Sequence, residues 1–236
     1  VLVLSEDKDI FGGELDNTIL KDQLNLMRVG EPMYVFYGYV EDGYDENGHI
    51  VYKNMDDDPA ITAADKTIIG DPNPDFLVNL TTAVSYKGFT LSAFFQSSIG
   101  NDIYSLSMAA QAYDYGYNGN TLREVYYNHW TPENPTAKYP NLDQTSYKMS
   151  DRFVYDGSFV RLKNLELAYD VPCARSKFIK RARVYVSAQN LFTITSYPFW
   201  DPDINANGGG SSMIQGVDSY CYPSARTYTI GCRLTF

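Results

Sequence analysis

Alternation of apolar and polar residues over long stretches is the feature that most constrains this chain. From Ala225 to Phe236, the even positions after Arg226 are apolar and the odd positions are small or polar. The run from Ala182 to Gln189 repeats this pattern. Successive side chains of a strand point to opposite faces, so a period of two residues predicts strands with one apolar face. We therefore expect an all-β chain.

Six segments have this strand pattern, and a seventh, truncated one lies at Val1 to Leu4. The six are 33–40, 76–86, 89–100, 158–171, 182–195 and 225–236. Only Lys87 and Gly88 separate two of them, which predicts a hairpin with a very tight turn. Between 159 and 171 the apolar phase slips, which indicates a bulge near Lys163 and Asn164.

Short and long connections alternate between these strands. The short ones are 87–88 and 172–181, and the long ones are 41–75, 101–157 and 196–224. Outer-membrane barrels show this asymmetry, with short periplasmic turns and long extracellular loops. Soluble sandwiches and jelly rolls also alternate loop lengths, so the pattern leaves both architectures open.

Composition and charge exclude several classes of function. With 19 basic and 29 acidic residues the net charge is −10, so no basic face is available for nucleic acid. Apolar stretches are far shorter than the roughly 20 residues of a membrane-spanning helix. The carboxylates, such as Asp201 and Asp203, lie in long loops where solvation explains them, and no histidine adjoins a candidate nucleophile. We therefore expect no enzyme.

Several strings occur in an order and spacing that carry a specific resemblance. They are GDPNPDF (70–76), WTPENP (130–135), DGSFVRLKNLELAYDVP (156–172), VYVSAQNLFTITSY (184–197) followed by DPD (201–203), and the terminal RLTF. Together they resemble the C-terminal end of a SusC/RagA-type TonB-dependent outer-membrane transporter. The resemblance covers nearly the whole chain from about Gly30 onward.

This resemblance implies that residues 1–236 are the C-terminal antiparallel strands of a transmembrane barrel of about 22 strands with long extracellular loops. The family's plug domain, TonB-contact segment and remaining strands are absent from the chain, so we expect a fragment that pairs with the rest of the same transporter. It would lie in the outer membrane of a Gram-negative, Bacteroidetes-type cell, in contact with membrane lipid.

The family also implies a function and partners. Its members import glycan or peptide oligomers, receive energy through TonB and are capped by a SusD-like surface lipoprotein. Nutrient uptake of oligosaccharides or peptides is therefore the expected function. A secreted all-β glycan-binding module, whose aromatic side chains stack on sugar, is the alternative that the residues leave open.

The barrel reading assigns the two faces of the strands to different surroundings. With Phe236 periplasmic, as in the family, the long connections lie outside the cell. Alternate residues of a barrel strand meet lipid and lumen. We expect lipid contact for Val184, Val186, Ile230 and Leu234, and a lumenal position for Arg183, Gln189 and Arg233.

The last strand also carries a candidate assembly signal. Its apolar face ends in an aromatic residue, in the order Tyr228, Ile230, Leu234 and Phe236. Such a strand resembles the C-terminal signal by which the outer-membrane assembly machinery recognises barrel substrates, because a strand-adding partner can bind an exposed edge. The alternative is that Phe236 is only an interfacial anchor.

Residues 54–65 align with a calcium-binding loop. The oxygen ligands would be Asn54, Asp56, Asp58 and Asp65, and many family members have a similar string. Position six of such a loop needs a glycine with positive φ, but here it is Pro59, whose ring fixes φ near about −65°. We therefore expect no cofactor and a solvated acidic loop, with calcium binding as the alternative.

The long connection 101–157 is rich in aromatic residues. Tyr113, Tyr115, Tyr117 and Trp130, with Tyr126, Tyr127 and Tyr139, could line an outer vestibule and stack on substrate. The alternative is that these rings pack the connection against its neighbours or against the lipoprotein lid.

Overall fold

The computed structural model describes residues 9–11, 15–16, 21–113, 120–173, 178–204 and 214–236. The sequence analysis treats the chain as one region, whereas the structure divides it into two compact units. The sheet unit comprises Pro74–Gly100, Gly157–Asp203 and Tyr222–Phe236, and the loop unit comprises Val1–Asn73, Asn101–Asp156 and Ile204–Cys221. The truncated strand expected at Val1 to Leu4 lies outside the described residues.

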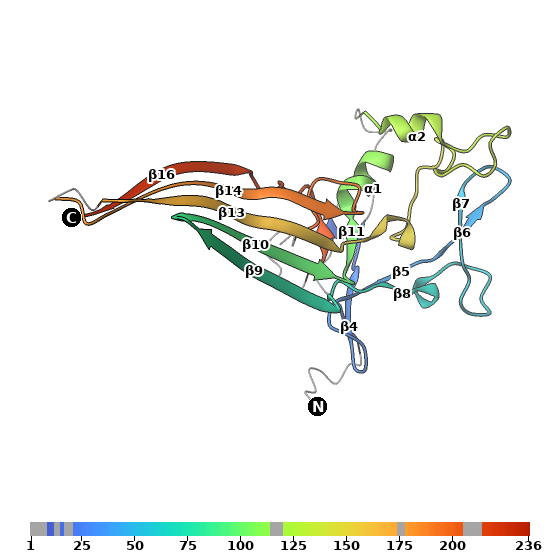
Figure 1. The fold of residues 1–236 in the computed structure, drawn as a ribbon. Coiled ribbons are helices and arrows are strands. Elements are labelled where there is room, and N and C mark those ends of the chain that lie inside the picture. Colours follow the sequence, from blue (N-terminus) through green and yellow to red (C-terminus); the bar gives the residue numbers. More distant parts are fainter. Residues whose placement is uncertain (1–8, 12–14, 17–20, 114–119, 174–177, 205–213) are drawn as a thin grey trace. The chain divides into compact units, whose positions relative to one another are not determined.

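The sheet unit contains one antiparallel sheet of five strands in the order β16-β14-β13-β10-β9, which lie side by side in Figure 1. The strands are β9 (Phe76–Tyr86), β10 (Phe89–Ile99), β13 (Phe159–Val171), β14 (Arg181–Thr195) and β16 (Thr227–Thr235). Five of the six predicted strands are therefore confirmed, each to within two residues at either end.

The register of this sheet gives each face a distinct chemistry. One row across all five strands is apolar and 48% to 84% exposed: Val84, Leu91, Leu167, Val186 and Ile230. The next row is small or polar: Ala83, Ser92, Glu166, Ser187 and Thr229. Neighbouring rows lie on opposite faces, so the predicted division of the strand residues between two faces is confirmed.

Charged residues on the polar face pair across the strands. Arg183 lies opposite Asp170 and Arg233, and its guanidinium is 3.5 Å from carboxylate oxygens of both Asp170 and Glu166. Gln189 lies opposite Thr227. The sheet thus has an apolar face and a face of hydroxyl, amide and charged groups.

Two local features predicted from the sequence are present in this sheet. Lys87 and Gly88 have φ of 48° and 88°, and Tyr86 pairs directly with Phe89, so the turn is a two-residue type I′ hairpin. Along β13 the pairing with β10 steps from Asn164 to Leu162, which leaves Lys163 as the extra residue of a bulge. The bulge returns Leu162 to the apolar phase.

The predicted strand 33–40 is wrong as a strand of this sheet. Only Val35–Gly38 (β5) forms a strand, and it belongs to a separate sheet in the loop unit. Val35 and Phe36 are adjacent and both are buried, at 1% and 0% exposure. The segment is apolar at nearly every position, as in strands buried on both faces, and it lacks the polar alternation of a strand with one wet face.

The loop unit is built from short elements. One sheet has the order β1-β4-β5-β8, with β1 at Asp9–Phe11, β4 at Asn25–Arg28 and β8 at Thr67–Gly70. A second has the order β12-β11-β15, at Val154–Asp156, Asp102–Ser105 and Val217–Asp218. Two strand pairs are β2 (Leu15–Asp16) with β3 (Lys21–Asp22), and β6 (Glu41–Tyr44) with β7 (Ile50–Tyr52). Helices α1 (Leu106–Tyr113) and α2 (Arg123–Tyr127) and 3₁₀ turns η1 (Ala63–Asp65) and η3 (Asp151–Phe153) also belong to the described part of it.

These elements enclose a hydrophobic core that the sequence analysis did not predict. Leu24, Phe36, Tyr104 and Val217 are fully buried in it. Glu41 accepts hydrogen bonds from Ser150 Oγ at 2.6 Å and from Arg152 Nε at 2.8 Å. The long connections therefore fold together into a packed unit. In the described part of the chain, no helix is both long and apolar enough to cross a membrane.

Candidate functional site

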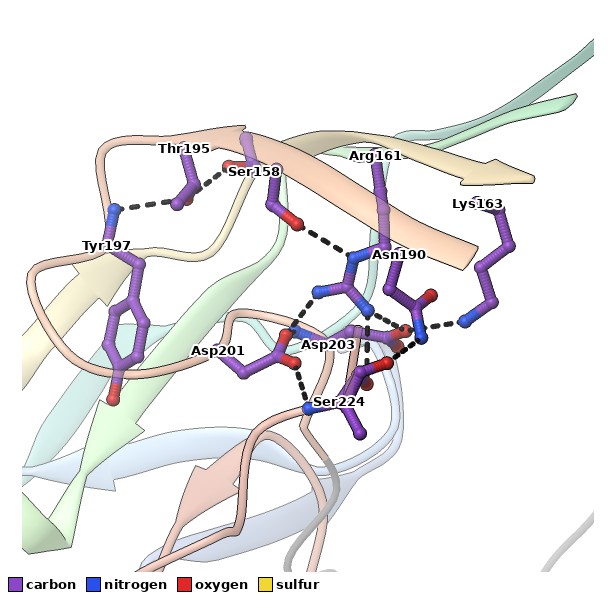
Figure 2. Close-up of polar contacts among 11 residues, drawn as sticks. Ser158, Arg161, Lys163, Asn190, Thr195, Tyr197, Asp201, Asp203 and Ser224 are labelled. Atoms are coloured by element: carbon purple, nitrogen blue, oxygen red, sulfur yellow. Dashed lines mark hydrogen bonds and ion pairs between the residues drawn. The ribbon is translucent and has the colours of Figure 1, made fainter. Parts of the chain in front are cut away.

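Several of the motif strings converge on Arg161 in the sheet unit. Arg161 lies on β13 and is 1% exposed, and it is the largest fully buried side chain among the described residues. Its Nε donates to Thr193 Oγ1 on the paired strand β14 at 2.9 Å, and its Nη2 pairs with Asp201. Nη1 donates to Asp203 Oδ2 at 3.1 Å and to Ser224 Oγ at 3.3 Å (Figure 2). One guanidinium therefore holds both strands and two connecting segments.

Asp201 is the main counter-charge of Arg161. It is 6% exposed, and it accepts backbone hydrogen bonds from Ser224 at 2.8 Å and Asp203 at 3.0 Å. Burial raises the pKa of Asp201, but these two N–H groups and the guanidinium more than offset burial, so its pKa lies below the ordinary value. The expectation that solvation explains this carboxylate is wrong, because Asp201 is buried and both of its oxygens accept hydrogen bonds from the protein.

The neighbouring residues extend this network to the bulge. Asn190 lies on β14 opposite the bulge with φ of 51°, and its Nδ2 donates to the carbonyl oxygen of Ala225 at 2.9 Å. Lys163, the extra residue of the bulge, has its Nζ 3.9 Å from Asp203 Oδ2. The bulge thus turns two polar side chains toward the segments after β14 and before β16, as Figure 2 shows.

A pocket of about 500 Å³ opens beside the network, within the sheet unit. Arg161, Asp201 and Ser224 contribute to its lining, and so do Asn190, Trp200 and Arg226. The sequence analysis did not predict this site. The sequence does contain the two charged partners: Arg161 lies in one motif string, and Asp201 lies 40 positions later in the DPD of another.

The calcium-like loop 54–65 is closed by hydrogen bonds between its own groups. Asp65 is 0% exposed, and its Oδ1 and Oδ2 each accept a backbone N–H at 2.7 Å, from Met55 and Thr62. Asn54, Asp56 and Asp58 each accept an N–H from the residue two positions on. The hydrogen bonds from the Met55 and Thr62 N–H groups lower the pKa of Asp65. The expectation of a solvated loop is wrong for Asp65, which caps η1 in a capping box with Thr62.

The side chains aligned with calcium ligands all accept backbone N–H groups in this structure. Each oxygen of the carboxylate at position twelve, where such loops bind the ion with two oxygens, accepts one backbone N–H. Over the ranges that the structure describes, no three His, Cys, Asp or Glu side chains are grouped to hold a metal ion.

Asp65→Asn should loosen loop 54–65 at neutral pH. The ionised carboxylate accepts both N–H groups, whereas an asparagine side chain turns an NH₂ donor toward one of them. Because the folded pKa of Asp65 is lowered, its contribution is present at neutral pH and is lost as the pH falls through that lowered value. Limited proteolysis should cut the variant faster within the loop. Asp57→Asn, at an exposed position of the same loop, should be cut at the wild-type rate; equal acceleration in both would contradict the role of Asp65.

The predicted vestibule residues do not share one environment. Tyr113 is 5% exposed, and its ring stacks on Tyr147 with centroids 3.7 Å apart. It cannot also stack on a substrate, so the packing alternative holds for Tyr113. Trp130 is half-buried, and its ring packs directly against Gly48, where a Cβ would lie only 2.3 Å from the ring. Tyr115 and Tyr117 lie outside the described residues.

The remaining aromatic residues of that connection divide in the same way. Tyr139 is buried, while Tyr126 and Tyr127 are 62% and 64% exposed and pack edge to face on α2. In the sheet unit, Tyr228, Ile230 and Leu234 of β16 and the following Phe236 are all exposed. Among the strands that the structure describes, β16 is at the edge of its sheet and pairs with β14.

Comparison with known proteins identifies relatives for the chain as a whole. No family model matches it. TonB-dependent receptor P3 of Formosa agariphila is 32% identical in an alignment of 254 positions, which covers 99% of this chain and 25% of the receptor. TonB-dependent receptor SusC of Bacteroides thetaiotaomicron is 30% identical over 215 residues, which cover 89% of this chain and 20% of the receptor.

The fold has matching relatives among solved structures. The RagAB peptide importer in its 'closed-closed' state superposes with a TM-score of 0.79 at 25% identity, over 99% of this chain and 25% of that one. The chain spans about a quarter or less of the length of the curated relatives it matches. In sequence and in fold, it is a fragment of a SusC/RagA-like TonB-dependent transporter.

Proposed function

We propose that the full-length protein is a TonB-dependent importer of the bacterial outer membrane, and that this chain forms the C-terminal part of its barrel. The observation that carries the proposal is the apolar row across all five strands beside a polar row. In a membrane-spanning barrel the apolar row meets lipid and the polar row meets the lumen. A soluble protein would leave this five-strand apolar row in water, which soluble monomers avoid.

The order of the connections gives the proposed orientation. In an antiparallel sheet, successive connections lie at opposite ends of the strands. The short turns after β9 and β13 share one end, and the long connections after β10 and β14 share the other. Barrels of the outer membrane place short turns in the periplasm and long connections outside. The pocket beside Arg161 then lies on the lumenal face of the sheet, near its extracellular end.

The proposed partners follow from the same assignment. The rest of the polypeptide supplies the other strands and the plug, because an open sheet edge in lipid leaves backbone groups unpaired. TonB contacts the part of the protein outside this chain, and a SusD-like surface lipoprotein covers the extracellular mouth. The cargo is an oligosaccharide or a peptide. The likeness to the RagAB peptide importer supports the peptide class, and the oligosaccharide class rests on the family resemblance of the motif strings.

Fractionation and growth together test this function. The tagged full-length protein should be found in the outer membrane and should need detergent for extraction. Deleting its gene, or disabling TonB, should abolish growth on at least one oligomeric nutrient that the wild type uses. A protein that is monomeric and soluble without detergent would contradict the proposal and favour a secreted glycan-binding module.

Removing Phe236 should reduce the amount of folded barrel in the outer membrane. We propose that Tyr228, Ile230, Leu234 and Phe236 form the signal that the assembly machinery binds, since β16 is an open edge until it pairs with the first strand of the barrel. The heat-modifiable folded species, quantified by gel shift, should fall severalfold. Phe89→Ala removes a similarly exposed ring at the same end of the sheet and should have a much smaller effect. Equal amounts of folded protein in the two variants would leave Phe236 only an anchoring role.

A further inference from the structure

The pocket beside Arg161 has the size and lining of a binding site for a small polar ring. Its volume of about 500 Å³ lies within the range of about 300–1,000 Å³ that is usual for small-ligand pockets. Thr193, Thr195 and Ser224 contribute to its lining. The hydroxyl oxygens of Thr193 and Ser224 accept from Arg161, which leaves their O–H donors for a ligand, and the Thr195 hydroxyl bonds Ser158 and Tyr197. Asn190 also lines it, and its Oδ1 is a buried acceptor without a hydrogen-bond partner in the described part of the chain. A ligand with several hydroxyl groups supplies donors and acceptors for such a lining.

Trp200 gives the pocket an aromatic surface. Its side chain is 58% exposed, and one face of the indole stacks on Phe199 with centroids 4.8 Å apart and an angle of 16° between the planes. The stack covers one face of the indole, and more than half of the side chain remains exposed. The apolar C–H face of a pyranose packs well against a ring held in this way.

Arg226 gives the pocket its uncompensated charge. The buried guanidinium of Arg161 is neutralised by Asp201, and Lys163 lies near Asp203. Arg226 is exposed, and no carboxylate among the described residues pairs with it. The chain has a net charge of −10, so an unpaired arginine in this pocket indicates a site for a negatively charged ligand. Its planar guanidinium matches a carboxylate with two parallel hydrogen bonds.

We propose that this pocket binds a uronate residue of an oligosaccharide, with the sugar ring against Trp200 and its carboxylate on Arg226. The inference rests on the proposed import function and adds the substrate class. A neutral sugar would leave Arg226 unpaired. An acidic peptide would satisfy Arg226 but would bring neither a pyranose face for Trp200 nor a set of hydroxyl groups for the threonine, serine and asparagine side chains.

Calorimetric titration of the purified full-length transporter tests the proposal. The probes are tetragalacturonate and tetramannuronate, with methyl-esterified tetragalacturonate as the uncharged match and tetraglutamate as the peptide match. At least one uronate should bind, and its ester should bind about tenfold or more weakly. Arg226→Gln should weaken uronate binding about ten- to a hundredfold, and Trp200→Leu about tenfold.

Two matched variants keep the test specific to the pocket. Arg233→Gln removes another arginine of the polar face, and Tyr126→Leu removes an exposed ring of the loop unit; both should bind uronate like the wild type. The proposal is overturned if neither uronate binds, if the ester binds as well as the acid, if Arg226→Gln or Trp200→Leu leaves affinity unchanged, or if tetraglutamate binds with the same dependence on both residues. These results concern binding alone. Failure of the import function would instead appear as a protein absent from the outer membrane.

Discussion

Replacing Arg161 with methionine should destabilise the folded transporter by about 3–5 kcal/mol, the usual cost of removing one partner of a buried ion pair. Asp201 is 6% exposed and would keep its negative charge without a counter-charge. The strands β13 and β14 would also lose their shared link to the segments that carry Asp201 and Ser224. Chemical unfolding of the full-length protein in detergent measures the change.

Two further variants separate the buried pair from general loss of charge. Lys163→Met removes a half-exposed cation of the same strand, 3.9 Å from Asp203, and should cost about 1 kcal/mol or less. Adding Asp201→Asn to Arg161→Met should recover part of the loss, because no bare charge then remains buried. Equal destabilisation by Arg161→Met and Lys163→Met would contradict the network.

The same carboxylate should also make stability depend on pH. The pKa of Asp201 is lower in the folded protein than in the unfolded chain. Its ionised form therefore stabilises the fold above the ordinary aspartate pKa of about 4, and this contribution is lost as the pH falls through the lowered value. Asp201→Asn should flatten the acid limb of the stability profile.

Arginine at Ile230 should cost about 2–4 kcal/mol, whereas arginine at the adjacent Thr229 should cost far less. Ile230 is in the apolar row that crosses all five strands, and Thr229 is in the polar row beside it. A charge on the lipid-facing row is placed in hydrocarbon, while one on the other row enters a wet lumen. Unfolding midpoints and the heat-modifiable species measure both. Equal costs would contradict the assignment of the faces.

The fold of the sheet unit could be predicted because its signals are local. Alternation defined its strands, the slip of phase near Lys163 defined the bulge, and a lysine followed by glycine defined the turn. The segment 33–40 was wrongly predicted as a strand of this sheet. Its residues are apolar on both faces, and this pattern does not show which sheet a strand joins. The core of the loop unit joins Leu24, Tyr104 and Val217, which are far apart in the chain and carry no shared period.

The candidate site could be predicted only in part for the same reason. The strings around Arg161 and Asp201 identified the family, yet their pairing depends on a fold that brings β13 next to the segment after β14. Trp200 and Arg226 lie in no periodic pattern that separates them from other surface residues. The tyrosines, chosen for their abundance, include Tyr113, whose ring serves the core.

Thiol labelling of intact cells tests most directly whether this sheet crosses the outer membrane with its long connections outside. The full-length protein would carry one new cysteine, at Asn47 or at Lys87, in place of its native Cys173, Cys221 and Cys232. Asn47 is exposed in the part of the chain that precedes β9, and Lys87 is exposed in the tight turn between β9 and β10. A large, membrane-impermeant maleimide should label the cysteine at position 47 on intact cells and the one at position 87 only after the outer membrane is opened. Labelling of position 87 on intact cells, or protection of position 47, would contradict the account.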